Sequence, residues 1–553
     1  MTRRELTLDG VLLVALAVLA YLTWGVPGSS AATATGLPAW AEARDQLLDG
    51  PDAGRWAGQA LALLGGHPER LDAHRLPTWT ILTAAVARGL DLSVPLAGHL
   101  ANHLLRVFMG PVAMLAGRGV GLGRVAAAAI GAVVVMSPSV GDNAARFTVD
   151  TAVTLAWLVA IAAPALLSRR PATAAIAGAL TAFAAVTHLT TAAVLFPAAV
   201  LLFQGLPPGR RLATGGAFAA ALGTTLWSVF QVFPPLPLSM LGGTLSAGVA
   251  TGSPAPTASG AETARVAGVV ADQVAHLGPQ FRLWLEDGVG GGRLPLSVLV
   301  CLAVVGVLGV GLKPRSERLT ALARWAPRAL RVAVDTGVRG SGAGVALVLA
   351  LAPVAALFLV GAPKRYADTL LPIAVLLVGR GAVSLGSVAE AFLAARGLRP
   401  RSGTFAAGGG LALAAVLTLG RSPGVARPID PLDLATAEAA AGLRALLPPD
   451  AALAGGTPEL VALAGGHPCP ARQCPVRPTA ADIQSCLDAM HNQCRGAEGK
   501  VPYVVVERIP DGRAVAVVAL DAWLAQRHQP VAVWSTSEVS FTLLSVARDT
   551  SFR

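Results

Sequence analysis

Long apolar runs separated by short polar connections dominate the first 420 residues of the chain. Because a membrane-crossing helix needs roughly 17 to 25 residues, these runs predict about eleven transmembrane helices. Their approximate ranges are 6–24, 94–116, 121–138, 148–167, 172–187, 189–205, 212–231, 294–312, 341–361, 366–381 and 403–420. The predicted fold class is therefore a polytopic α-helical membrane protein.

Clusters of Lys and Arg alternate with these apolar runs, as they do in cytoplasmic loops of membrane proteins. The clusters are Arg118 with Arg124, 168–170, 210–211, 313–339 and 380–401. This distribution places the N-terminus in the cytoplasm, and an odd number of spans then places the C-terminus outside. We expect a transmembrane domain over 1–420, with outer segments at 25–93 and 232–293, and a second domain over 421–553.

Composition agrees with a membrane protein. Hydrophobic residues make up 54% of the 553 residues and charged residues 14%, and the mean hydropathy is +0.61. A net charge of +11 would suit nucleic acid if the basic residues formed one soluble patch, but they lie between apolar runs. The sequence also contains no P-loop and no internal repeat, so neither a nucleic-acid partner nor an ATP-driven machine is expected.

The segment 421–553 has the pattern of a small α/β domain. The run VPYVVVERI at 501–509 predicts a buried strand, and Thr479 followed by Asp482 resembles a helix capping box.

Four of the five cysteines lie in this tail, and Cys301 lies inside a predicted span. The four are Cys469, Cys474, Cys486 and Cys494. Their spacing and the predicted oxidising compartment favour disulfides, with three pairings open. Zinc binding with His467 or His491 is the alternative.

The first outer segment contains PDAGRWAGQALALLGG at 51–66, which predicts an amphipathic interfacial helix over 53–64 ended by Gly65-Gly66. Asp52 precedes the first turn of that helix. It is therefore either an N-cap or a functional carboxylate. Asp45 and Asp49 are either the wet face of an earlier helix or alternates for that carboxylate.

A polar stripe interrupts the predicted span that begins at Val94. It consists of His99, Asn102, His103 and Arg106, which share one helix face by their spacing. Polar groups at that depth usually face a hydrated cavity or a partner helix. The stripe therefore predicts either a pocket wall or a network between helices, and its HxxxH pair leaves a divalent metal open.

A third cluster lies in SPSVGDNAARFTVD at 137–150, where Asp142, Arg146 and Asp150 are four residues apart. They would share a face if the segment is one helix, as a salt-bridged helix end or as part of a site.

A fourth cluster lies in PKRYADTLLP at 363–372, on the predicted outer side. Lys364 and Arg365 are placed there to bind an anion such as phosphate, or a lipid headgroup. His188, in the turn THLT, faces the same compartment.

Together these features resemble the GT-C superfamily of integral-membrane glycosyltransferases. The members that use polyprenyl-phosphate sugars come closest: protein O-mannosyltransferases, lipid A aminoarabinose transferases and rhizobial lipopolysaccharide-core galacturonosyltransferases. The residues that carry the resemblance are the segment from Asp52 to Gly65, Arg75 to Pro77, Asp150, and Arg365, Tyr366 and Pro372. The family's acidic residue usually follows the first span sooner and as a pair, which keeps Asp45 and Asp49 as alternates.

The resemblance implies transfer of a sugar from a polyprenyl-phosphate carrier to a lipid, glycan or protein acceptor, with inversion, at the outer face of a bacterial inner membrane. It implies catalytic roles for Asp52 and Asp150. It also implies donor-phosphate binding by Lys364, Arg365, Tyr366 and His188, and a pocket that contains Arg55, Arg75, His99, Asn102, His103, Arg106 and Arg146. The alternative functions are a non-catalytic transporter or scaffold for envelope glycolipids, and an oligosaccharide ligase or polymerase.

Overall fold

The computed structural model describes residues 3–23, 48, 51–66, 76–167, 170–203, 208–232, 279–289, 292–309, 326–359, 364–396, 403–418, 431–446, 452–455, 462–464, 467–468, 502–508, 529–535 and 540–545. The chain divides into two compact units. Unit 1 comprises Met1–Gly25, His103–Ala144 and Val149–Ala426, and unit 2 comprises Val26–Asn102, Ala145–Thr148 and Arg427–Arg553.

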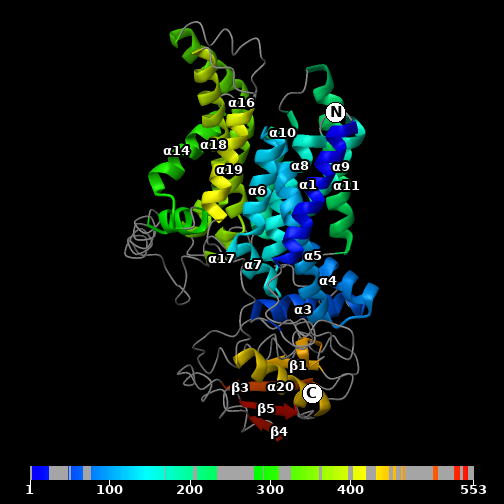
Figure 1. Ribbon diagram of the computed structural model, residues 1–553. Coiled ribbons are helices and arrows are strands. Elements are labelled where there is room, and N and C mark those ends of the chain that lie inside the picture. The colour runs from blue at the N-terminus through cyan, green and yellow to red at the C-terminus, as the bar shows by residue number, and fades with distance from the viewer. Residues whose placement is uncertain are drawn as a thin grey trace, which may run out of the picture. The chain divides into compact units, whose positions relative to one another are not determined.

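Unit 1 is built from helices (Figure 1). They are α1 (Arg3–Leu22), most of α5 (Val94–Gly119), α6 (Arg124–Val135), α7 (Pro138–Ala145), α8 (Asp150–Leu167), α9 (Pro171–Ala185), the 3-10 helix η2 (Leu189–Val194), α10 (Leu195–Phe203), α11 (Pro208–Val232), the π-helix η3 (Trp284–Val289), α14 (Leu296–Leu308), α16 (Ala326–Leu359), α17 (Lys364–Asp368), α18 (Leu371–Ala395) and α19 (Thr404–Thr418). Each apolar run of the sequence overlaps one or more of these helices.

Four helices in the described part of the chain are long and apolar enough to cross a membrane. They contain Val94–Gly119, Asp150–Leu167, Gly209–Gln231 and Leu371–Glu390. Helices α6 and α7, bent by 55° at their junction, would together form a fifth span, and six other apolar helices are shorter. The structure is thus that of a helical protein with membrane-spanning segments, and the number of eleven spans stays a prediction.

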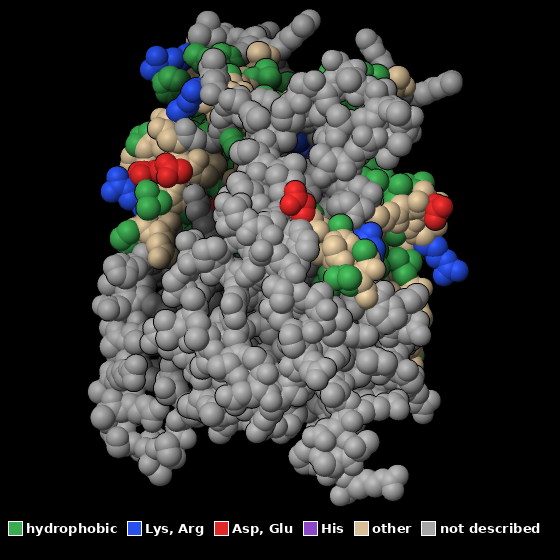
Figure 2. Space-filling view, turned by 90° about the horizontal axis from the view of Figure 1, so that it is seen from below, with side chains coloured by type: hydrophobic (Ala, Val, Ile, Leu, Met, Phe, Trp, Pro, Cys, Tyr) green, Lys and Arg blue, Asp and Glu red, His purple; other side chains and the backbone are tan. Residues whose placement is uncertain are grey.

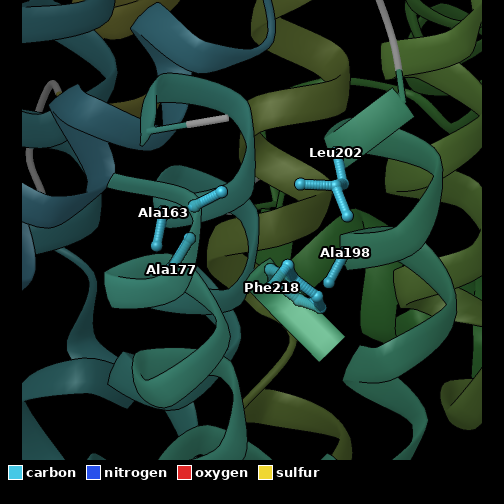
Figure 3. Close-up of a cluster of buried hydrophobic side chains, with 6 residues drawn as sticks. Ala163, Ala177, Ala198, Leu202 and Phe218 are labelled. Carbon is cyan, nitrogen blue, oxygen red and sulfur yellow. The ribbon is translucent and has the colours of Figure 1, made fainter. Parts of the chain in front are cut away.

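Small residues allow the helices of unit 1 to pack closely. A cluster from α8, α9, α10 and α11 buries Ala163, Ala174, Ala177, Ala198, Leu202 and Phe218 (Figure 3). Beside it, a Cβ added at Gly178 would lie 2.2 Å from the carbonyl oxygen of Phe218, so the backbones of α9 and α11 meet directly. Helices thus approach through Ala and Gly. These small residues lower the mean hydropathy of each span, but they allow the helices to pack closely.

Helix α18 differs from the sequence-based prediction. The basic segment that begins at Arg380 was expected to be a loop, but α18 continues to Ala395 and Arg380 is buried. The Nε of Arg380 donates to the carbonyl of Gly306 at 2.6 Å, and its Nη1 donates to the carbonyl of Val120. Because carbonyl groups near two helix ends receive its donors, the charge is accommodated without a loop.

Unit 2 contains three whole helices, α3 (Pro51–Leu64), α4 (Pro77–Leu90) and α20 (Pro431–Leu446). It also contains the first turns of α5. It also contains a five-stranded sheet in the order β2-β1-β3-β5-β4. The strands are β1 (Ala452–Gly455), β2 (His467–Pro468), β3 (Pro502–Arg508), β4 (Gln529–Ser535) and β5 (Ser540–Ser545). Strand β1 is parallel to β2 and β3, whereas β5 is antiparallel to β3 and β4. The strand predicted at 501–509 corresponds to β3.

The surface shows no continuous basic area on the face that Figure 2 presents, as far as described residues are concerned. Charged side chains occur there singly or in small groups among hydrophobic ones.

Candidate functional site

The structure brings His188 and the Arg365-Tyr366 pair together in unit 1. The rings of His188 and Tyr366 stack with their centroids 5.6 Å apart and their planes at 27°. The Cζ of Arg365 lies 5.0 Å from the centroid of the Tyr366 ring, and its Nη2 donates to the Tyr366 hydroxyl at 3.2 Å. We call these three residues the anion cluster, because their guanidinium, imidazole and phenol groups can donate hydrogen bonds to an anion.

Local hydrogen bonds fix the orientation of His188. It is the N-cap of η2, where its backbone N–H donates to Thr191 Oγ1 at 2.9 Å and its Nδ1 accepts from the Thr190 N–H at 3.3 Å. Because Nδ1 acts as an acceptor, the ring proton of the neutral imidazole lies on Nε2. His188 therefore presents an N–H donor on the side of the ring away from η2.

On the other side of the cluster, the short helix α17 holds Arg365 and Tyr366. The hydroxyl of Thr369 donates to the carbonyl of Tyr366 at 2.6 Å and ends this helix before α18 begins at Leu371. All three residues of the cluster are half-buried, so they are partly accessible. Lys364 is the first residue of α17, and its side chain is outside the described ones.

Asp150 lies at the same end of unit 1 as the anion cluster. Helices α8 and α9 pack side by side and are joined by three residues, 168–170, so they must run antiparallel. The first residue of α8, Asp150, is therefore level with the end of α9 and with His188, which follows it. Asp150 is 1% exposed, and its backbone carbonyl accepts from Thr154 Oγ1 at 2.9 Å. Figure 1 shows α7 and α17 at this end of the bundle, which we call the α17 end.

The polar stripe of α5 is buried along its whole length. His99 and Asn102 are 0% exposed, Arg106 3% and His103 6%. Asn102 Nδ2 donates to the carbonyls of Arg146 at 2.5 Å and Thr148 at 2.9 Å. Within unit 2, Asn102 thus holds the segment 145–148 against α5, which is the network role.

The predicted common face of Asp142, Arg146 and Asp150 is wrong. Helix α7 ends at Ala145, α8 begins at Asp150, and residues 146–148 form bends between them. The three residues therefore belong to three different segments. The helix is interrupted at the residues whose carbonyls, those of Arg146 and Thr148, accept hydrogen bonds from Asn102.

Two aromatic residues of unit 2 were not predicted as part of any cluster. The Phe147 ring makes edge contacts with Trp79, centroids 6.1 Å apart, and with His99, centroids 5.8 Å apart. It lies over Gly98, where an added Cβ would be 2.0 Å from the ring. The glycine one residue before His99 was the available signal, since a glycine inside a helix often marks a close approach.

Helix α3 forms where the sequence predicts it but is more deeply buried than an interfacial helix. It ends at Leu64, and Gly66 has a φ of +73°, as expected for a glycine stop. Helix α3 packs against α4, and Thr80 Oγ1 donates to Gln59 Oε1 at 3.1 Å. Ala53, Ala57 and Ala62 are also buried, so buried side chains occur on several faces of α3.

Asp52 is the second residue of α3, since the helix begins at Pro51 and not after Asp52. It therefore lies in the first turn instead of at the N-cap. Proline suits the first position of a helix because its missing N–H would have no partner there. Arg55, one turn further on, is half-buried.

Several predicted site residues lie outside the described residues. They are Asp45, Asp49, Arg75 and the cysteines Cys469, Cys474, Cys486 and Cys494. Cys301, which is described, is a free and exposed cysteine in α14. In the described ranges, no group of three or more His, Cys, Asp or Glu side chains is arranged to hold a metal ion.

No protein-family model matches the chain, and no curated protein matches it. Among solved structures, it is similar to ArnT from Cupriavidus metallidurans bound to undecaprenyl phosphate, with 13% identity, a TM-score of 0.49, and coverage of 96% of this chain and 97% of that one. It is also similar to the Archaeoglobus fulgidus oligosaccharyltransferase in complex with Zn and sulfate, with 12% identity, a TM-score of 0.44, and coverage of 95% and 72%.

Proposed function

We propose that the protein is a membrane glycosyltransferase. It moves a sugar from a polyprenyl-phosphate carrier to a lipid, glycan or protein acceptor at the outer face of a bacterial inner membrane. In this topology the N-terminus is cytoplasmic and the tail 421–553 is periplasmic.

The observation that carries the proposal is the anion cluster at the end of an apolar helical bundle. A phosphate on a polyprenyl chain stays at the membrane boundary, because its tail remains in the hydrocarbon layer. The guanidinium of Arg365 and the Nε2–H of His188 offer a charged and a neutral donor at one place. Arginine also suits phosphate geometrically, since its planar fork can donate two parallel hydrogen bonds.

These donors fit the bond that breaks in the reaction. The acceptor hydroxyl attacks the anomeric carbon, and the bond from that carbon to the phosphate oxygen breaks. Negative charge then develops on the leaving phosphate, where fixed donors lower the barrier. We assign this role to Arg365 and His188, with Lys364 beside them, and we assign to Tyr366 the task of holding both in place.

A carboxylate must accept the proton that the acceptor hydroxyl loses. The sequence resemblance assigns this base to Asp52, with Asp45 and Asp49 as alternates. Asp150, buried at the α17 end of unit 1, is the second acidic residue to which the resemblance gives a catalytic role. Attack by one activated hydroxyl needs no covalent intermediate and inverts the anomeric carbon.

The test is transfer from a polyprenyl-phosphate sugar by purified full-length protein, after mass spectrometry of envelope glycans from a deletion strain has identified the missing sugar and its acceptor. Asp52→Asn should lower transfer by at least about a hundredfold, since the acceptor loses its base. Asp142→Asn is the matched control, because this acidic residue lies in the polar part of α7 and has no assigned role.

Normal transfer by Asp52→Asn together with inactive Asp45→Asn or Asp49→Asn would move the base to that position. An unchanged envelope in the deletion strain, with intact binding of glycolipids by the protein, would instead favour the transporter or scaffold.

A further inference from the structure

Within the described residues, Arg106 is a buried cation without a carboxylate partner. It is 3% exposed, and its Nη2 donates to the carbonyl of Thr23 at 2.8 Å. Among the residues that the structure describes, this carbonyl is its one hydrogen-bond acceptor, no carboxylate pairs with it, and its Nε has no acceptor. A buried charge is costly unless an opposite charge compensates it.

The surroundings show where Arg106 lies. One helical turn further along α5, an added Cβ at Gly110 would lie 3.3 Å from Leu16 of α1 and 2.6 Å from Val135 of α6. Arg106 is on the same face of α5, one turn before this packing layer between α1, α5 and α6. Thr23, its acceptor, directly follows Leu22, the last residue of α1. The charge is therefore level with the boundary at which α1 would leave the membrane.

The outer faces of the flanking helices are apolar and exposed. On α5, Leu104 is 44% and Phe108 is 54% exposed, and on α1, Val18 is 48% and Leu22 is 74% exposed. Such faces contact hydrocarbon in a membrane protein. At the boundary between hydrocarbon and water, the anions present in quantity are the phosphates of lipids.

A second buried arginine, Arg380 of α18, differs from Arg106 in the number of its hydrogen-bond acceptors. Arg380 donates to the carbonyl of Gly306, near the C-terminal end of α14, and to the carbonyl of Val120, directly after α5. Its donors are used to join helices. Arg106 is as deeply buried, but in the described part of the chain one carbonyl accepts from it, which leaves most of its donors for another group.

We infer that Arg106 binds the phosphate of a lipid at the end of the seam between α1, α5 and α6, as a second anion site beside the cluster of His188, Arg365 and Tyr366. The lipid tail lies along the apolar outer faces of α1 and α5. The choice of a polyprenyl phosphate as one candidate lipid rests on the proposed function, whereas a phosphate on a membrane phospholipid offers the same chemistry.

The experiment uses purified full-length protein with three probes: undecaprenyl phosphate, phosphatidic acid and undecaprenol. Native mass spectrometry counts bound lipids, and thermal unfolding is followed with and without each probe. Arg106→Met should weaken binding of the phosphate probe by at least about tenfold, because a charge-assisted hydrogen bond is lost. It should leave the weak binding of undecaprenol unchanged.

Stability without lipid separates a ligand site from a helix staple. If Arg106 awaits an anion, Arg106→Met should keep or raise the melting temperature of the lipid-free protein. It should also reduce the rise with the phosphate probe to the part that the anion cluster supplies. Arg380→Met is the control, and it should lower the lipid-free melting temperature while leaving lipid affinity intact. Equal phosphate-lipid binding by wild type and Arg106→Met, or a lipid-free destabilisation as large as that of Arg380→Met, would overturn the inference.

The choice of probe separates this inference from the proposed function. Equal dependence of both phosphate probes on Arg106 supports the site and identifies membrane phospholipid as a ligand. If only the binding of undecaprenyl phosphate depends on Arg106, the result supports the site and identifies the polyprenyl-phosphate carrier as its ligand. If wild type binds phosphatidic acid through Arg106 but binds no undecaprenyl phosphate, the proposed function fails and the Arg106 site stands.

Discussion

The ring of His188 stacks on the ring of Tyr366. His188 is the N-cap of η2 and Tyr366 lies in α17, so the two residues are far apart in the chain. Tyr366 in turn accepts a hydrogen bond from Arg365. One phenol therefore orients two cationic or donor groups toward the same region.

Arg365→Gln should reduce sugar transfer by about a hundredfold, because the leaving phosphate loses its charged donor. Arg365→Lys should recover part of the loss, since it keeps the charge but not the fork. Initial rates over a range of donor concentrations measure both. A normal rate in Arg365→Gln with normal donor affinity would contradict the role given to the cluster.

Tyr366→Phe keeps the stack on His188 and removes the hydroxyl that accepts from Arg365. We expect a smaller loss than for Arg365→Gln, about tenfold in transfer, because only the positioning of the guanidinium changes. Rates and thermal unfolding of the same preparation distinguish this effect from instability. A loss as large as that of Arg365→Gln would give Tyr366 a direct role in binding.

Thr191→Val tests the cap that orients His188. The substitution removes the hydroxyl that accepts from the His188 N–H, so the free energy of unfolding should fall by about 1 kcal/mol. Transfer should fall as well, since the imidazole is less well fixed. Thermal or denaturant unfolding gives the first value. Thr190→Val removes the hydroxyl that lies 3.0 Å from His188 Nδ1 but keeps the backbone N–H that donates to the same atom, so it should lower transfer with a smaller loss of stability than Thr191→Val.

Gly98→Ala should destabilise the protein, because the added Cβ would overlap the ring of Phe147. Gly89→Ala is the matched control, since nothing lies within 4 Å of its added Cβ in α4. It should stabilise by about 0.5–1 kcal/mol through helix propensity. Unfolding of the two variants in parallel measures the difference, and Phe147→Leu should rescue Gly98→Ala in part. A stabilised Gly98→Ala would show that the ring is not held there.

The apolar helices of unit 1 could be predicted from the sequence because each one depends on its own run of residues. The end of α18 could not, because the buried Arg380 inside this helix donates to carbonyls of Gly306 and Val120, which are distant in sequence. Similarly, the break between α7 and α8 depends on Asn102, more than forty residues earlier in the chain. The sequence therefore predicts a helix end wrongly where a residue distant in the chain determines that end.

The candidate site shows the same division. The polar residues of α5 and the basic-aromatic segment of α17 stand out locally, since they interrupt apolar surroundings. Their partners do not: the pairing of His188 with Tyr366, and of Phe147 with Trp79 and His99, exists only in three dimensions.

The close approach of α9 to α11 bears on the order in which the chain assembles. Helices α8 to α11 follow one another in sequence and pack together, so their contacts close short loops and can form early during synthesis. The partner of His188 on α17 is synthesised much later, after α14 and α16. A nascent chain therefore contains a settled helical hairpin well before it contains an anion site, and it gains that site only when the segment at Tyr366 reaches the membrane.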